Sequence, residues 1–236
     1  MKRRELLASV VATAFAPGLA RAETISGSMP WVPGQAAVPP LAASTPTATL
    51  FFSPAEAETV GAIADRLIPE DGLSVGGREA GCVHFIDRQL IGPYGQAASQ
   101  YRLGRFIKGT PEQGLQSSLT PADRYRIGLT ALNDYCQTKH SLAFSGLSTQ
   151  TQDEILTGLE RKDINLATID GSEFFEQILQ NVREGFLSDP IYGGNKNLVS
   201  WKMLGFPGAY YDYRDVIDQK GKKLDFPPVS LFDTSI

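Results

Sequence analysis

Residues Phe186 to Gly208 read FLSDPIYGGNKNLVSWKMLGFPG, and we expect them to form a stiff corner between two helices. The first helix should end at Asp189-Pro190, because a proline ring disfavours the α conformation in the residue before it. Gly193-Gly194-Asn195 then supplies three residues that tolerate positive φ, so the chain can turn sharply there. The stretch therefore predicts a tight reversal at the end of a helix.

A short second helix should follow the turn. Asn197 can cap it, Gly205 can end it, and Pro207 keeps it from resuming. Tyr192 and Trp201 then lie on a rigid corner. The corner is either a tight connection between core helices or a contact surface for a partner, since Tyr and Trp carry a large apolar area at small entropic cost.

The helix that leads into this corner has the clearest amphipathic pattern in the chain. From Ser172 to Leu187, six apolar side chains recur at helical spacing, which predicts one broad buried face. They are Phe174, Phe175, Ile178, Leu179, Val182 and Phe186.

Other helices are predicted by local start signals. Ser53-Pro54-Ala55-Glu56 is typical of a capping box, and the helix should run to Pro69. Thr120-Pro121-Ala122-Asp123 is a second such start, and Thr149-Gln150-Thr151-Gln152 a third. Further helices are expected over Ala80–Ile91, 96–108 and 121–139. No segment shows the sustained period-two alternation that is typical of a β-strand. We therefore predict an all-α fold, a single irregular helical bundle with long loops.

The chain divides by composition into four segments. Residues 1–22 have a basic start, an apolar run and an Ala20-Arg21-Ala22 cleavage site, which indicates a signal peptide. Arg3-Arg4 favours the twin-arginine type, with an ordinary secretory signal or an uncleaved anchor as alternatives. The Pro/Ala-rich residues 23–50 should be a flexible linker, 51–208 the helical domain, and 209–236 an extended C-terminal tail. We therefore expect a periplasmic protein.

The charge balance excludes several classes of partner. The whole chain has a net charge of −4, and removal of residues 1–22 leaves 18 Lys and Arg against 25 Asp and Glu, a net charge of −7. With no basic stripe beyond the short run Lys220–Lys223, we expect neither nucleic acid nor an anionic membrane surface as a partner. Membrane association should come only indirectly, through another subunit.

The sequence contains few candidates for reaction chemistry. No dinucleotide fingerprint, phosphate-binding loop, G-x-S-x-G elbow or C-x-x-C-H motif is present, so we expect no catalytic residue, metal or cofactor in this chain. His84 and Asp87 stand three residues apart on one helix and could share a metal, but a satisfied, partly buried histidine is the favoured interpretation. Cys82 and Cys136 could form a disulfide between two helices; two buried thiols, or a bond to a partner chain, are the alternatives.

Two further segments could contact a partner. The polar stretch Gly109–Leu119 should be a loop between helices, favoured as a solvated connection. The tail after Gly208 has apolar residues but little helical order. It should either cross its own domain or lie extended on a neighbour, and we favour the neighbour.

Two motifs resemble one protein family. The run EGFLSDPIYGGNKNLVSWKMLGFPG, from Glu184 to Gly208, and AGCVHFIDRQL, from Ala80 to Leu90, are similar to the gluconate 2-dehydrogenase subunit 3 family. The similarity extends from about Phe51 to Tyr213. The resemblance implies a small, gamma subunit of a flavin-dependent, membrane-associated bacterial dehydrogenase that oxidises a sugar or sugar acid.

By the same resemblance, FAD would belong to a large subunit of the glucose-methanol-choline oxidoreductase type, and haem c to a c-type cytochrome subunit. This chain would stabilise the flavoprotein and travel with it during export. A free-standing periplasmic enzyme, or a small-ligand binder using a pocket near His84, is the alternative, and a general folding factor is a third. The motif suggests these candidate partner-binding and supporting residues: Arg183, Asp189, Tyr192, Asn195, Trp201, Lys202 and Phe206.

Overall fold

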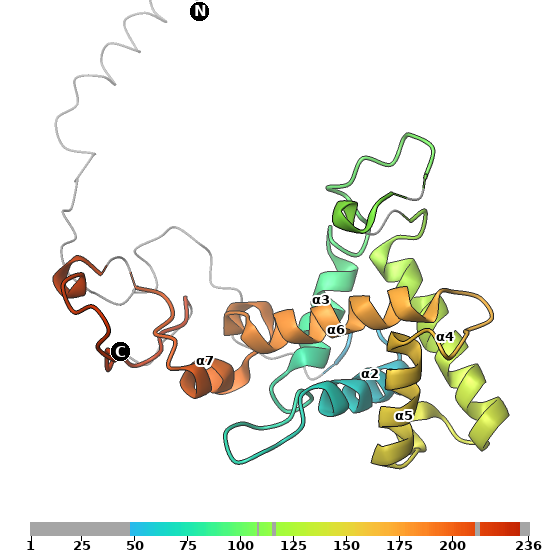
Figure 1. Ribbon diagram of the computed structural model, residues 1–236, viewed down its shortest axis with the longest axis horizontal. Coiled ribbons are helices and arrows are strands. Elements are labelled where there is room, and N and C mark those ends of the chain that lie inside the picture. The colour runs from blue at the N-terminus through green and yellow to red at the C-terminus, as the bar shows by residue number, and fades with distance from the viewer. Residues whose placement is uncertain (1–47, 108, 115–116, 211–212, 232–236) are drawn as a thin grey trace, which may run out of the picture. The chain divides into compact units, whose positions relative to one another are not determined.

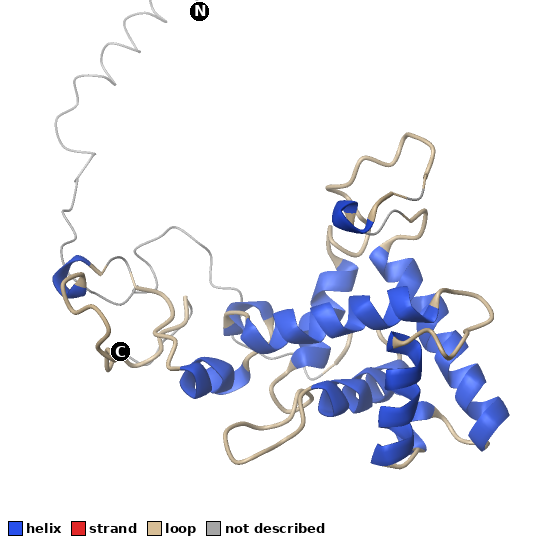
Figure 2. Ribbon diagram, in the orientation of Figure 1, coloured by secondary structure: helices blue, strands red, loops and turns tan. Residues whose placement is uncertain are grey.

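The protein is all-α in the part that the computed structural model describes, residues 48–107, 109–114, 117–210 and 213–231. Within these ranges there are six α-helices and no β-strand (Figure 2). The predicted signal peptide, most of the linker and the end of the tail lie outside the described residues. The helices are α2 (Pro54–Leu67), α3 (Cys82–Ile91), α4 (Pro121–His140), α5 (Thr149–Glu160), α6 (Gly171–Leu187) and α7 (Val199–Leu204).

The helix starts follow the predicted capping chemistry. Ser53 and Glu56 form a reciprocal capping box at the start of α2, and Thr120 and Asp123 form another at the start of α4. The start of α5 is one residue earlier than expected, because the Ser148 side chain is its N-cap. Local sequence therefore determines where these helices begin.

Helix α6 is the centre of the helical unit. Figure 1 shows it running between the other helices, and it contacts α2, α3, α4, α5 and α7. Its predicted apolar face is buried as expected, apart from the half-buried Leu179. Phe174 packs edge-on against Tyr125 of α4, with ring centroids 6.1 Å apart. The helix that delivers the chain to the corner is thus held on several sides by the core.

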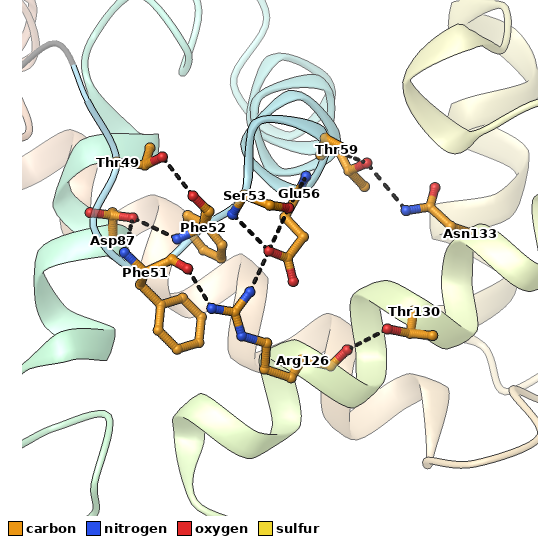
Figure 3. Close-up of polar contacts among 11 residues, drawn as sticks. Thr49, Phe51, Phe52, Ser53, Glu56, Thr59, Asp87, Arg126, Thr130 and Asn133 are labelled. Atoms are coloured by element: carbon orange, nitrogen blue, oxygen red, sulfur yellow. Dashed lines mark hydrogen bonds and ion pairs between the residues drawn. The ribbon is translucent and has the colours of Figure 1, made fainter.

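The buried side chain of Asp87 anchors the segment that leads into α2 (Figure 3). Its two carboxylate oxygens accept the backbone N–H groups of Leu50, Phe51 and Phe52 at 2.8, 2.9 and 2.9 Å. Arg126 of α4 lies over the Phe51 ring, 4.0 Å from its centroid, and donates to the Phe51 carbonyl. Asp87 is therefore a backbone anchor. No group of three or more potential metal ligands occurs among the described residues.

One predicted helix is wrong. The described part of the segment expected to be helical, residues 96–107, consists of turns and bends, and Ala97 has a φ of 53°. The apolar residues Tyr101, Leu103, Phe106 and Ile107 are all exposed, so the segment has no buried helical face. Without tertiary packing, the periodicity around Gly104 is insufficient to form a helix.

Residues 224–231 of the tail fold on their own domain, which is the less favoured of the two arrangements predicted for the tail. The Val229 N–H donates to the Pro207 carbonyl at 3.0 Å, and the Ala209 N–H donates to the Val229 carbonyl at 2.7 Å. Val229 is buried. The described residues between these points, 210 and 213–223, belong to a separate compact unit that contains a short 3-10 helix at Arg214–Val216.

Candidate functional site

The corner after α6 begins at Asp189, whose carboxylate accepts hydrogen bonds both from the corner and from the tail. The carboxylate accepts the Ile191 N–H at 2.9 Å and so caps the 3-10 helix η3 (Pro190–Tyr192). It also accepts the Ser230 hydroxyl at 2.6 Å and the Leu231 N–H at 3.0 Å. One side chain thus ties the corner to the returning tail, a connection that nothing local in the sequence indicates.

Asn195 holds the other half of the corner together from the inside. It is completely buried with a φ of 44°, a left-handed conformation that asparagine tolerates better than most residues. Its amide donates to the Ser188 carbonyl and accepts the Ser200 N–H, both at 2.9 Å. Asn195 therefore caps α7. The expected cap from Asn197 is wrong, because that side chain makes no capping hydrogen bond.

Glycines allow the backbone of the corner to pack directly against the backbone of α6 and of the residue before α3. A Cβ on Gly194 would lie 2.0 Å from the Gly185 carbonyl oxygen of α6, and a Cβ on Gly81 would lie 2.8 Å from the Gly193 oxygen. The Lys196 N–H donates to the Ala80 carbonyl at 2.9 Å beside this contact. The two sequence motifs, around residues 81 and 194, are therefore parts of one structural unit.

Trp201 is a buried residue that holds the corner against the end of α6. Only 7% of it is exposed, and its indole N–H donates to the Leu187 carbonyl at 2.9 Å. The Phe206 ring packs edge-on against it, with centroids 5.0 Å apart. Trp201 and Asn195 are both candidate contact residues, but their burial gives each a supporting role within the corner, and a direct contact with a partner stays a prediction.

A groove of about 710 Å³ runs beside the corner, between α3, α6 and η3. Phe85 is buried at its floor, while Leu187 and Tyr192 stand at its edge with 45% and 53% of their surface exposed. Arg183 and Glu184 give it one charge of each sign. Gln89, Gln180 and Ser188 complete the lining, so the groove combines apolar area with a few polar groups, as binding sites do.

The predicted contact residues therefore separate into three sets. Arg183 and Tyr192 lie together in the groove. Asn195 and Trp201 are buried beneath the corner, where Asp189 also acts as a support. Lys202 and Phe206 are exposed at α7 and after it, as are Met203 and Leu204. Sequence reasoning missed the contribution of α3 to the groove, Phe85 and Gln89.

A buried polar network lies behind the groove, between α4 and α6. Asn181 accepts the Tyr125 hydroxyl at 3.1 Å and contacts the Tyr94 hydroxyl, and its amide donates to Glu184 at 3.1 Å. Burial raises the pKa of Tyr125 well above its usual range and also raises the pKa of Tyr94. Arg124 donates to Gln177 at 2.6 Å, and burial lowers the pKa of its guanidinium. No periodicity in the sequence signals this network.

The two cysteines are buried as free thiols, not joined in the expected disulfide. The Cys82 thiol donates to the Val182 carbonyl of α6 at 3.5 Å, so it is directed at another helix. Burial raises the pKa of Cys82 to about 12 and that of Cys136 to about 11. Both therefore stay protonated at neutral pH, a state in which thiols are poor nucleophiles.

A family model described as gluconate 2-dehydrogenase subunit 3 matches residues 54–208. The match covers α2 to α7 and so includes the groove, its polar support and the glycine contacts of the corner. No curated protein and no solved structure matches the chain. None of the described helices has both the length and the apolar character needed to cross a membrane.

Proposed function

This chain belongs to the gluconate 2-dehydrogenase subunit 3 family, and from that membership we propose that it is the small, non-catalytic subunit of a bacterial dehydrogenase complex. A subunit family implies partners within such a complex. The substrate would be a sugar or sugar acid, and its pocket would lie in the catalytic subunit.

The partner in this proposal is a flavoprotein of the glucose-methanol-choline oxidoreductase type that holds FAD. A c-type cytochrome subunit with haem c would accept its electrons and attach the complex to the inner membrane on the periplasmic side. The basic start and apolar run of residues 1–22 support export, and the paired Arg3-Arg4 supports export of a folded flavoprotein together with this chain.

The observation that carries the proposal is the rigid corner with an apolar groove beside it, inside the region matched by the family. Asp189 and Asn195 fix the corner through hydrogen bonds to backbone groups, while Leu187 and Tyr192 remain exposed. A surface that is rigid before binding loses little conformational entropy when a partner docks. Because the subunit would bind only the folded flavoprotein, it would stabilise that protein by mass action.

A small-ligand binder is the competing function, since a groove of about 710 Å³ is within the size range of ligand pockets. His84 lies on α3 close to the corner, where its backbone is 3.7 Å from the position of a Cβ on Gly193. This alternative predicts activity or ligand binding by the isolated chain, and a loss of that activity in His84→Ala.

The proposal is tested by tagging the chain at its natural abundance in the organism that makes it and purifying it from the cell envelope. We expect a flavoprotein and a cytochrome to co-purify in fixed ratio, with flavin and haem absorbance that the chain alone lacks. Deletion of this chain should lower the abundance of the flavoprotein outside the cytoplasm. A chain that purifies alone and has dehydrogenase activity would contradict the subunit role.

A further inference from the structure

The loop between α3 and α4 exposes an unusual concentration of apolar side chains. Within Tyr101–Ile107, the exposed fractions are 82% for Tyr101, 89% for Leu103, 45% for Phe106 and 71% for Ile107. Exposed apolar residues on a monomer are ordinarily scattered singly, and a contiguous group marks an interaction site. We call residues 101–107 the apolar loop; in Figure 1 it belongs to the green segment that extends beyond the ends of α3 and α4.

The apolar loop is also basic, on a chain that is acidic as a whole. Arg102 and Arg105 alternate with its apolar residues, and the sequence has no Asp or Glu between Asp87 and Glu112. The net charge of the chain is −4. The local charge therefore differs in sign from the rest of the protein, which favours a partner surface that carries carboxylates.

The loop is held in place by contacts at its base. The Arg102 guanidinium lies over the Phe106 ring, 5.8 Å from its centroid, and donates to the carbonyl of Ser118, in the segment that leads back to α4. Nearer α3 and α4, the Ala122 N–H donates to the Gly95 carbonyl at 3.0 Å. Leu103 and Ile107 remain exposed although the loop around them is tethered.

The base of the loop is continuous with the groove beside the corner. The Tyr94 hydroxyl contacts Asn181 at 3.1 Å, and the same Asn181 amide donates to Glu184, which lines the groove. Ile91 and Tyr94, at the end of α3, are 44% and 38% exposed. A partner seated in the groove would therefore meet the start of this loop next.

We propose that the apolar loop is a docking element for the catalytic flavoprotein subunit, and that it inserts Leu103 and Ile107 into an apolar pocket rimmed by Asp and Glu. This inference rests on the proposed function. Aromatic residues and arginine, the types that alternate here, are enriched in the cores of protein interfaces. Three basic residues, Arg102, Arg105 and the adjoining Lys108, are fewer than the clusters of about four to eight that hold proteins on anionic membranes. A symmetric contact between two copies would bring the same arginines together.

The test uses the separately purified flavoprotein subunit and this full chain, with affinity measured at several salt concentrations. Leu103→Ser combined with Ile107→Ser should weaken binding at least about 30-fold, because two aliphatic side chains lose their burial. The matched control is Leu73→Ser combined with Leu142→Ser, since these leucines are 76% and 50% exposed in other loops. The control should bind as the wild type does. Arg105→Glu should slow association and reduce its salt dependence.

Normal binding by the loop variant would overturn the inference, and two further measurements would then identify what the loop contacts. If the loop variant binds the flavoprotein like the wild type, the loop is not part of the interface. If it binds normally but loses attachment to phosphatidylserine vesicles, the loop is a membrane contact. If the wild type forms a dimer that the variant cannot form, the occupant is a second copy. Failure of the wild-type chain to bind the flavoprotein at all would instead contradict the proposed function.

Discussion

Replacing Asp87 by alanine should detach residues 50–52 from α3. The carboxylate is completely buried and accepts three backbone N–H groups at 2.8 to 2.9 Å. Leu50 is 58% exposed, so its N–H can return to water, whereas the Phe52 N–H is buried. Hydrogen bonds to a charged group contribute roughly 1.5 to 3 kcal/mol each, so the bonds from the half-buried Phe51 and the buried Phe52 together predict a loss of about 3 to 6 kcal/mol.

The free-energy cost of detaching residues 50–52 altogether limits the loss of stability in Asp87→Ala. If residues 50–52 leave the surface, the orphaned N–H groups become solvated, but Phe52 loses its burial and its contact with Tyr125, whose ring centroid is 5.8 Å away. That burial is worth roughly 2 to 3 kcal/mol, and the remaining anchor contacts are lost with it. Asp87→Asn should cost less than Asp87→Ala, because one oxygen still accepts while the amide faces a donor.

The assay is urea unfolding of the purified chain, followed by circular dichroism at neutral pH. The control is Asp153→Ala, which removes a surface carboxylate that pairs with Arg66 at 2.7 Å; exposed ion pairs contribute roughly 0.2 to 1 kcal/mol. Asp87→Ala should also expose the 50–52 amides to hydrogen exchange. A free energy of unfolding within about 1 kcal/mol of the Asp153→Ala value would refute the anchor role.

Three further predictions follow from the corner, the capping boxes and the thiols. Gly194→Ala should destabilise the protein by at least roughly 2 kcal/mol, because its Cβ would lie 2.0 Å from the Gly185 oxygen. The control Gly72→Ala, whose Cβ would have nothing within 4 Å, should be nearly neutral in the same urea titration. Equal losses of stability in the two variants would contradict the close contact at Gly194. Hydrogen bonds from Thr120 lower the pKa of Asp123 in the folded state, so this carboxylate stabilises the fold above its unfolded pKa. That contribution is lost as the pH falls through the folded pKa, so Asp123→Asn should lose less stability than the wild type below about pH 4. An unchanged dependence of stability on acid pH would contradict this role of Asp123. Because burial raises the pKa of Cys82 to about 12 and that of Cys136 to about 11, a thiol reagent at pH 8 should label the folded chain slowly. After unfolding without reductant, the same reagent should label two thiols per chain. Labelling of none would indicate a disulfide instead.

Local signals predicted the helices well. The capping boxes at Ser53 and Thr120 need only residues within one helical turn, so they can be recognised from sequence. The end of α7 at Gly205, with a φ of 68°, is another case. The segment 96–107 failed because its periodicity was weak and its outcome depended on whether a core face was available, which no local pattern specifies.

The candidate site was predicted in part. The motif pointed to the corner, and Arg183 and Tyr192 do lie together in the groove. Yet Trp201 is buried because six-residue α7 turns that face inward, and Asn195 is buried because its side chain hydrogen-bonds within the turn before α7, and no local pattern specifies either. The anchor at Asp87 joins segments more than 30 residues apart, so it could be found only in three dimensions.

We propose that this chain binds and stabilises the catalytic flavoprotein of a dehydrogenase. The most direct measurement is the thermal inactivation of that purified flavoprotein with and without an excess of this chain, with sedimentation of the same mixture. Binding should give one complex of fixed ratio and an inactivation temperature that rises with the concentration of the chain until saturation. Separate sedimentation of the two proteins, with an unchanged inactivation temperature, would contradict it.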